Sequence, residues 1–392
     1  MNKVLQRFIT LATVGAMALS MVACGGEKDE TIILKNVTQA KNVILMIGDG
    51  MGPHQIRAGE LYKGEKLTMQ KFPYSAFVET RSASDAITDS AAAATALATG
   101  TRTTNGVVGK DSSYQDLETI VDIAAKLGKR TGILATEALS GATPMGFSGH
   151  ANSRNYSEEL LESAATSGNV NLFASAVLKA TYHSIFEEAG YEKLINADDI
   201  SQSTSDKVFG SYVIQAASEP MSANGGMVAF DRLVTEALEY LSKDEDGFFL
   251  MAEGSHIDHG GHDNNFAYML EELIAFDNAV EAVLKWAKGR DDTVVIVTAD
   301  HETGGLFVSP AATHEMVKQA YTDYKTSYIE NDECYEWTTS GHTNTDVCIF
   351  INGADINFAQ YSFNDDDYIK NTDVFHIMNY LMTGTVYTPV VE

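Results

Sequence analysis

The chain is short of positive charge. Its 27 lysines and arginines stand against 54 aspartates and glutamates, which gives a formal net charge of −27 over 392 residues. Nucleic-acid binding needs a basic surface, so this balance argues against a nucleic-acid partner. An anionic substrate would also be repelled, unless its binding site carried local positive charge.

Cysteine and proline are scarce as well, with three and six residues respectively. Cys334 and Cys348 could pair in an oxidising compartment. Cys348, however, lies in the apolar run 347–351, which favours a small buried hydrophobe over a disulfide partner. Hydrophobic residues make up 44% of the chain, which is enough for a sizeable core.

The chain also lacks a long apolar run that could span a membrane. Its longest one, 8–22, is short, follows Lys3 and Arg7, and precedes a small residue and Cys24. This pattern predicts a lipoprotein signal peptide at 1–23, a lipid anchor on Cys24 and a polar tether at 24–40. The alternative is a plain secretory signal. Either way we expect an exported protein, and the lipoprotein would face the periplasm or cell surface.

No internal repeat or low-complexity linker interrupts residues 41–392, so we expect one domain there. Continuous apolar runs predict strands buried on both faces, and amphipathic stretches between them predict helices. Strands that alternate with helices indicate an α/β fold with a mostly parallel sheet. The expected strands are 42–47, 131–136, 248–252 and 293–298, the expected helices are 114–127 and 266–286, and 305–341 reads as an insertion.

Ser90 stands at the mouth of an alanine run, with Asp89 before it. A serine hydroxyl becomes a useful nucleophile only with a nearby base, a metal or a helix N-terminus to activate it. The stretch around Ser90 holds neither histidine nor lysine. Taken alone, Asp89 and Ser90 are therefore best interpreted as an ordinary helix N-cap.

Acidic residues and histidines follow several of the expected strands. Asp49, Glu253 and the pair Asp300-His301 each come where a strand ends, and ligands bind beyond the carboxyl ends of such strands. The segment 253–262 holds two carboxylates and three imidazoles, which are the ligands of catalytic zinc. A metal site is therefore favoured over a histidine-rich surface loop.

Six segments between residues 41 and 353 together resemble the alkaline phosphatases: 42–52, 88–100, 142–154, 253–262, 298–301 and 341–346. Asp-Ser-Ala-Ala at Asp89 and Thr-Ala-Asp-His before Glu302 are the most specific of these motifs. The resemblance implies a three-layer α/β sandwich around a mostly parallel central sheet, with a small insertion near 305–341. It also implies homodimers as one option, which the sequence leaves open.

The resemblance assigns a role to each residue that matches a motif. One zinc, which activates the nucleophile Ser90, would be held by Asp49, Asp300 and His301. A second zinc would be held by Asp258, His262 and His342. One magnesium would be held by Asp49, Thr143 and Glu253, and Arg154 would clamp the phosphate.

These roles imply hydrolysis of phosphate monoesters through a phosphoseryl intermediate. Three divalent cations carry +6 against −4 from the four carboxylates, and Arg154 adds one positive charge, which suits a dianionic substrate. Two other hypotheses remain: a phosphodiesterase or sulfatase of the same superfamily, and a surface lipoprotein that binds phosphate or metal without turnover.

The sequence departs from the family pattern at one position of the expected magnesium site. Gly141 stands two residues before Thr143, where relatives usually carry Asp or His that helps to organise the magnesium site. We therefore expect weaker magnesium binding. His259 could touch phosphate or add a ligand, whereas His150 and His256 are interpreted as structural.

Overall fold

The computed structural model describes residues 31–215, 227–327, 331–360 and 368–386. The expected signal peptide and Cys24 lie outside these residues. The last part of the expected tether does not extend freely, because the backbone N–H of Leu34 donates to Asn352 and Val37 bridges to Ala354. None of the described helices is long and apolar enough to cross a membrane.

An eleven-stranded sheet forms the centre of the fold, with the order β15-β2-β14-β9-β1-β8-β3-β4-β6-β5 and β7 paired with β6. Its pairs are parallel except those that β14 makes with β2 and β9. The strands are β1 Asn42–Gly48, β2 Tyr74–Glu79, β3 Arg130–Ala138, β4 Leu172–Ala176, β5 Glu192–Leu194, β6 Val208–Gln215, β7 Met227–Ala229, β8 Phe248–Gly254, β9 Thr293–Thr298, β14 Val347–Asn352 and β15 Tyr368–Lys370.

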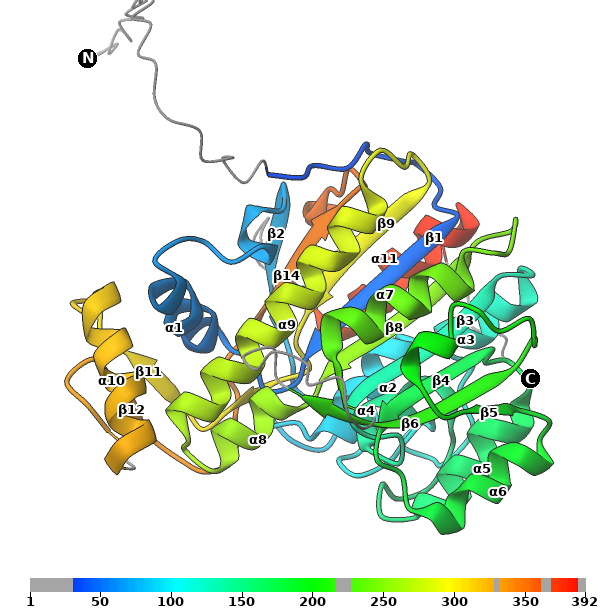
Figure 1. Ribbon diagram of the computed structural model, residues 1–392, viewed down its shortest axis with the longest axis horizontal. Coiled ribbons are helices and arrows are strands. Elements are labelled where there is room, and N and C mark those ends of the chain that lie inside the picture. Colours follow the sequence, from blue (N-terminus) through cyan, green and yellow to red (C-terminus); the bar gives the residue numbers. More distant parts are fainter. Residues whose placement is uncertain (1–30, 216–226, 328–330, 361–367, 387–392) are drawn as a thin grey trace, which may run out of the picture. The chain divides into compact units, whose positions relative to one another are not determined.

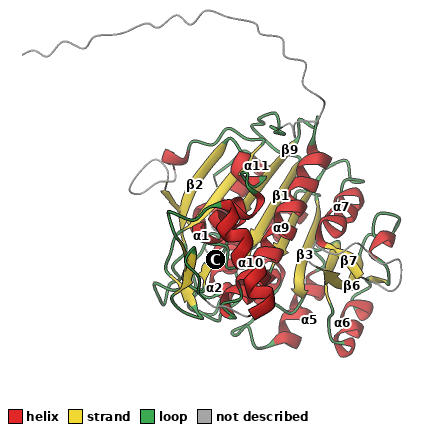
Figure 2. Cartoon of the chain, turned by 60° about the vertical axis from the view of Figure 1, so that its left-hand side comes forward, coloured by secondary structure: helices red, strands yellow, loops and turns green. Residues whose placement is uncertain are grey.

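Helices cover both faces of this sheet (Figures 1 and 2). One layer contains α1, α7 and α9, and the other contains α2, α3, α4 and α11. Their bounds are α1 Pro53–Lys63, α2 Ser90–Thr99, α3 Ile120–Lys126, α4 Ala142–Ser148, α5 Ser157–Ser167, α6 His183–Glu188, α7 Phe230–Leu241, α8 His256–His262, α9 Phe266–Ala287, α10 His314–Ser327 and α11 Asn371–Thr383. The predicted three-layer α/β fold is therefore confirmed.

The insertion lies between β9 and β14, where the sequence predicts it. Its strands β11 (Leu306–Val308) and β12 (Tyr335–Trp337) pair antiparallel, and α10 between them packs on α1 and α9. Cys334 is buried directly before β12 and Cys348 is half-buried in β14, and both are free thiols. The interpretation of Cys348 as a small hydrophobe, rather than a disulfide partner, fits this arrangement.

One predicted helix is too long. The expected helix 114–127 is helical only over α3, because Asp111 binds the backbone N–H groups of Ser113 and Gln115 and Tyr114 has a φ of 64°. The helix begins only where Thr119 and Asp122 form a reciprocal capping box.

The alanine run has a packing reason as well as a helical one. Every residue of α2 is buried, and a Cβ on Gly146 of α4 would lie 2.6 Å from the Cβ of Ala94. Small side chains therefore let the two helices approach closely beneath the sheet. This approach holds the start of α2, and with it Ser90, in a fixed place.

Candidate active site

The carboxyl ends of three neighbouring strands bring the acidic residues together. β1 pairs in parallel with β8 and β9, and Ile47 lies opposite both Glu253 and Thr298. Asp49, Glu253 and Asp300 are therefore set at one edge of the sheet. Gly50 has a φ of 72°, and a Cβ there would lie 2.7 Å from the Cα of Asp258, so only glycine lets this turn approach α8.

A first donor group surrounds Ser90 and consists of Asp49, Asp300 and His301. The three residues offer ligand atoms within 4.8 Å of one another, and all are buried. Nε2 of His301 lies 3.5 Å from Asp49 Oδ1 and 3.2 Å from Asp300 Oδ2. The hydroxyl of Ser90 lies 3.2 Å from the same Nε2, so it adjoins this group directly.

A second donor group consists of Asp258, His262 and His342, which also lie within 4.8 Å of one another. The segment 256–262 is helical (α8), so Asp258 and His262 stand one turn apart, with 3.4 Å between Oδ2 and Nε2. His342 belongs to β13 (His342–Thr343), and its ring lies 3.6 Å from that of His301, measured between centroids. The two donor groups are thus adjacent.

Hydrogen bonds at the outer nitrogens determine what the second donor group presents inward. Nδ1 of His262 lies 2.7 Å from the carbonyl oxygen of Ser340, and Nδ1 of His342 lies 2.9 Å from that of Thr88. A carbonyl oxygen only accepts, so in the neutral rings both Nδ1 atoms carry the proton. The two Nε2 lone pairs are then 3.2 Å apart and repel each other unless a cation lies between them.

Thr303 fixes His301 in the same way. Its hydroxyl donates to Asp258 Oδ1 and lies 3.2 Å from Nδ1 of His301. The hydroxyl therefore accepts the proton of Nδ1, which leaves Nε2 of His301 with a lone pair among the carboxylates. This one side chain links the two donor groups.

Several carboxylate oxygens in the site are buried without a hydrogen bond among the described residues: Asp49 Oδ1, both oxygens of Glu253 and Asp300 Oδ2. Burial, and then the charge of Asp258, raises the pKa of Asp300 from 3.8 to about 7. Burial, and then neighbouring carboxylates, raises the pKa of Asp49 and Glu253 well above the usual range. Burial lowers the pKa of His301 well below its ordinary value.

These observations fit metal ions at both donor groups. Converging lone pairs, buried unpartnered carboxylates and outer hydrogen bonds on each histidine are the arrangement that protein metal sites use. Each donor group mixes carboxylate oxygen with imidazole nitrogen, which is the chemistry that zinc accepts.

The expected magnesium residues form a third group, Asp49, Thr143 and Glu253. Thr143 is the second residue of α4, and its hydroxyl donates to Asp49 Oδ2 over 3.5 Å. Both oxygens of Glu253 are unpartnered, as noted above. The donors in this group are all oxygens, which suits magnesium rather than zinc.

Asp89 connects Arg154 to the start of α2, where Ser90 lies. The sequence alone predicts only a helix N-cap at Asp89. Asp89 Oδ1 accepts from the backbone N–H of Ala92 at the start of α2, while Asp89 Oδ2 lies 3.2 Å from Arg154 Nη1. The backbone N–H of Gly106 also donates to this carboxylate. Asp89 therefore joins α2 to the guanidinium of Arg154. The sequence does not show this role, because the two residues are 65 positions apart.

Three histidines near the motifs, His150, His256 and His259, belong to neither donor group. Nε2 of His150 lies 2.9 Å from the carbonyl oxygen of Leu117, as a structural histidine should. Burial, and then His259, lowers the pKa of His256 to about 4, so it is neutral beside Glu272. His259 is exposed on α8.

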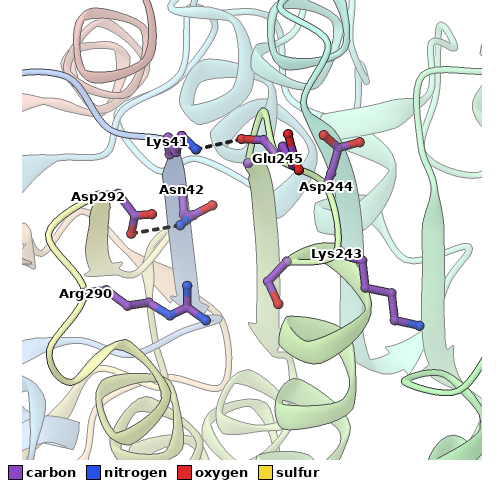
Figure 3. A pocket seen from close by; sticks show the side chains of 9 residues that line it. Lys41, Asn42, Lys243, Asp244, Glu245, Arg290 and Asp292 are labelled. Atoms are coloured by element: carbon purple, nitrogen blue, oxygen red, sulfur yellow. Dashed lines mark hydrogen bonds between the residues drawn. The ribbon is translucent and has the colours of Figure 1, made fainter.

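A cavity of about 290 Å³ lies at the opposite ends of the strands and is not part of this site (Figure 3). Polar groups on its wall bond to one another: Asn42 donates to Asp292, and Lys41 donates to the carbonyl oxygen of Glu245. It lies at the amino ends of β1, β8 and β9, away from the donor groups.

Known proteins match most of the chain. A family model described as alkaline phosphatase matches residues 40–186 and 183–330. Alkaline phosphatase 3 of Bacillus subtilis (strain 168) is 30% identical over 335 residues, which cover 79% of this chain and 71% of that protein. Alkaline phosphatase of Escherichia coli (strain K12) is 29% identical over 353 residues, which cover 72% and 75%.

Solved structures agree with this match. Alkaline phosphatase from the Antarctic bacterium TAB5 aligns with a TM-score of 0.72 and 28% identity, over 88% of this chain and 98% of that one. One structure of a TAB5 mutant has Mg bound in the M3 site. Family and fold together support a phosphatase function with metal-binding residues, and this chain belongs to the alkaline phosphatase family.

Proposed function

We propose that the protein hydrolyses phosphate monoesters through a phosphoseryl intermediate, with two zinc ions and one magnesium ion as cofactors. The observation that carries this proposal is the place of Ser90. Its hydroxyl stands at the N-terminus of α2 and lies 3.2 Å from Nε2 of His301, beside converging donor atoms. A cap alone would not need buried, unpartnered carboxylates around it.

In this proposal Ser90 and Arg154 have different roles. Ser90 is the nucleophile, and the start of α2 places partial positive charge beside it. Arg154, held by Asp89, can bind two phosphoryl oxygens through its planar guanidinium. When bound, the zinc ions supply positive charge that lowers the pKa of a hydroxyl or water and stabilises the attacking and leaving oxygens.

The reaction then has two displacements at phosphorus. Ser90 Oγ forms a bond to phosphorus while the bond to the alcohol oxygen breaks, and the alcohol leaves with the proton that Ser90 has lost. Water next bonds to phosphorus, the bond to Ser90 breaks, and a proton returns to the serine. The products are an alcohol and inorganic phosphate.

Other activities fit the site less well. Sulfatases carry x-Pro-x-Arg after the nucleophile, whereas four alanines follow Ser90. Many phosphodiesterases of this superfamily use a threonine nucleophile and lack the arginine clamp, whereas this chain carries Ser90 and Arg154. A protein that only binds phosphate or metal would not need a serine next to the donor atoms.

The test compares the full-length chain with two variants on a monoester, a diester and a sulfate ester, alongside metal analysis. We expect bound zinc and preferred monoester turnover. Ser90→Ala should keep its zinc and lose at least about a thousandfold in kcat. Ser112→Ala, an exposed serine, is the matched control and should behave as the unaltered chain. Little zinc and no monoester turnover would contradict the proposal.

We further propose that the chain is exported and anchored through a lipid on Cys24. The support is the basic start, short apolar run and small residue before the cysteine. Labelling cells with a fatty-acid analogue should mark the chain, and Cys24→Ser should remove the label. A labelled Cys24→Ser variant would refute the anchor.

A further inference from the structure

The third group has a gap at Gly141 that another residue fills. A Cβ built on Gly141 would lie 1.8 Å from Oε1 of Glu137 and 2.5 Å from its Cδ. The carboxylate of Glu137 therefore occupies the space that a side chain at Gly141 would need. Gly141 caps α4, two residues before Thr143, so this carboxylate lies beside the third group.

The backbone holds Glu137 next to Glu253. Ala135 of β3 lies opposite Glu253 of β8, and Glu137 follows two residues later. The backbone N–H of Glu137 donates to Ser255 Oγ at 3.2 Å, just beyond the end of β8. Glu137 lies where the pairing of β3 with β4 shifts register, between Ala135 and Ala138, and Ser255 joins β8 to α8.

The two glutamates are electrostatic neighbours, and among the described residues no lysine or arginine forms an ion pair with either. Glu137 is the charged neighbour that raises the pKa of Glu253 most, after burial. Burial itself raises the pKa of Glu137 to about 7, with Arg154 acting in the opposite direction. Among the described residues no hydrogen bond to the Glu137 carboxylate is found, and both oxygens of Glu253 are buried and unpartnered.

We propose that the Glu137 carboxylate is a ligand of the magnesium site, taking the place of the side chain that Gly141 lacks. The proposal rests on the function proposed above. It reverses the expectation that Gly141 weakens magnesium binding. With Glu137 the third group has three carboxylates and one hydroxyl, an all-oxygen set that selects a hard cation.

The charge balance of the whole site points the same way. Glu137 raises the number of carboxylates around the site to five. Two zinc ions alone would leave it at −1, which would repel a dianionic phosphate, whereas a further divalent cation returns it to +1 before Arg154 is counted. With Arg154 counted, the site is neutral with two zinc ions and carries +2 with a third divalent cation, so the third cation favours binding of a dianionic substrate.

Metal binding to the full chain tests this role directly. The purified protein is stripped with a chelator, reloaded with zinc and titrated with magnesium, and bound ions are measured by mass spectrometry. We expect two zinc ions and one magnesium per chain. Glu137→Gln, which keeps the shape of the side chain, should keep two zinc ions and weaken magnesium binding at least about tenfold. The exposed Glu159→Gln is the control and should bind as the unaltered chain does.

A double variant that moves the carboxylate from position 137 to position 141 distinguishes loss of a metal ligand from a general structural effect. Glu137→Ala combined with Gly141→Asp clears the clashing side chain and returns a carboxylate to the same space. It should recover magnesium binding relative to Glu137→Ala alone. Unchanged magnesium affinity in Glu137→Gln, with zinc still bound, would overturn the proposal. Failure of zinc to bind the unaltered chain would instead overturn the proposed function.

Discussion

Removing the metal ions should reverse how the stability of this protein depends on pH. In the metal-free chain, burial raises the pKa of Asp300 from 3.8 and of Glu137 from 4.5, in each case to about 7. The folded state then binds more protons than the unfolded state between these values, so the free energy of unfolding falls as the pH rises through 7.

The magnitude follows from proton linkage. Between pH 6 and pH 8.5, a carboxyl group with a folded pKa near 7 loses about 1.4 kcal/mol, so these two lose roughly 2 to 3 kcal/mol together. Asp49 and Glu253, with pKa values also raised by burial, act in the same direction. His301, whose pKa burial lowers, acts in the opposite direction by less than about 1 kcal/mol, because an unfolded histidine is already near its midpoint at pH 6.

Guanidinium denaturation followed by circular dichroism measures this difference. The chelated protein should be less stable at pH 8.5 than at pH 6 by at least about 2 kcal/mol. The protein reloaded with zinc and magnesium should show no such loss, since metal ligands must be deprotonated and binding strengthens with pH. A chelated protein that is equally stable at both values, or more stable at pH 8.5, would refute the buried carboxylates as the cause.

Three further predictions concern residues around the site. Thr303→Val should weaken zinc binding about 10- to 100-fold in a competition titration with a chelator, and Thr303→Ser should restore it; equal affinities in all three would exclude a positioning role. Asp89→Asn keeps a cap but loses the charge that holds Arg154, so the inhibition constant of phosphate should rise about tenfold, with unfolding altered by less than about 1 kcal/mol. Gly146→Ala places a methyl group against Ala94 and should lower the free energy of unfolding by about 1 to 3 kcal/mol in denaturant melts, whereas an unchanged value would mean that α2 and α4 can move apart.

The order of elements could be predicted from the sequence because buried parallel strands leave a plain signal. The expected strand 42–47 is β1 with one residue added, and 293–298 is β9 without change. The predicted helix 114–127 is too long because Asp111 holds a turn in which Tyr114 has a φ of 64°, a conformation that a helix does not allow. Periodicity reports burial well, and local turn chemistry poorly.

Each donor group contains one pair of residues that are close in sequence, whereas Asp49 and His342 were assigned from the resemblance to the family. Asp258 and His262 are close in sequence, and Asp300 adjoins His301, so each pair forms within one turn of chain. Thr303 was not predicted from the sequence. Its hydroxyl contacts both His301 and Asp258, and Asp258 is 45 residues away. A contact of that kind depends on the packing of α8 against the strand ends, which no local pattern carries.

Gly141 shows the limit most clearly. A motif assigns a function to a position in the chain, whereas a cation requires an oxygen at a point in space. Here a side chain at position 141 and the Glu137 carboxylate in its present position exclude each other, since a Cβ on Gly141 would meet Oε1 at 1.8 Å. The glycine therefore leaves room for Glu137 to reach this place from the end of β3. A change that looks like a loss of the magnesium site becomes, in the folded chain, an exchange of one acid for another.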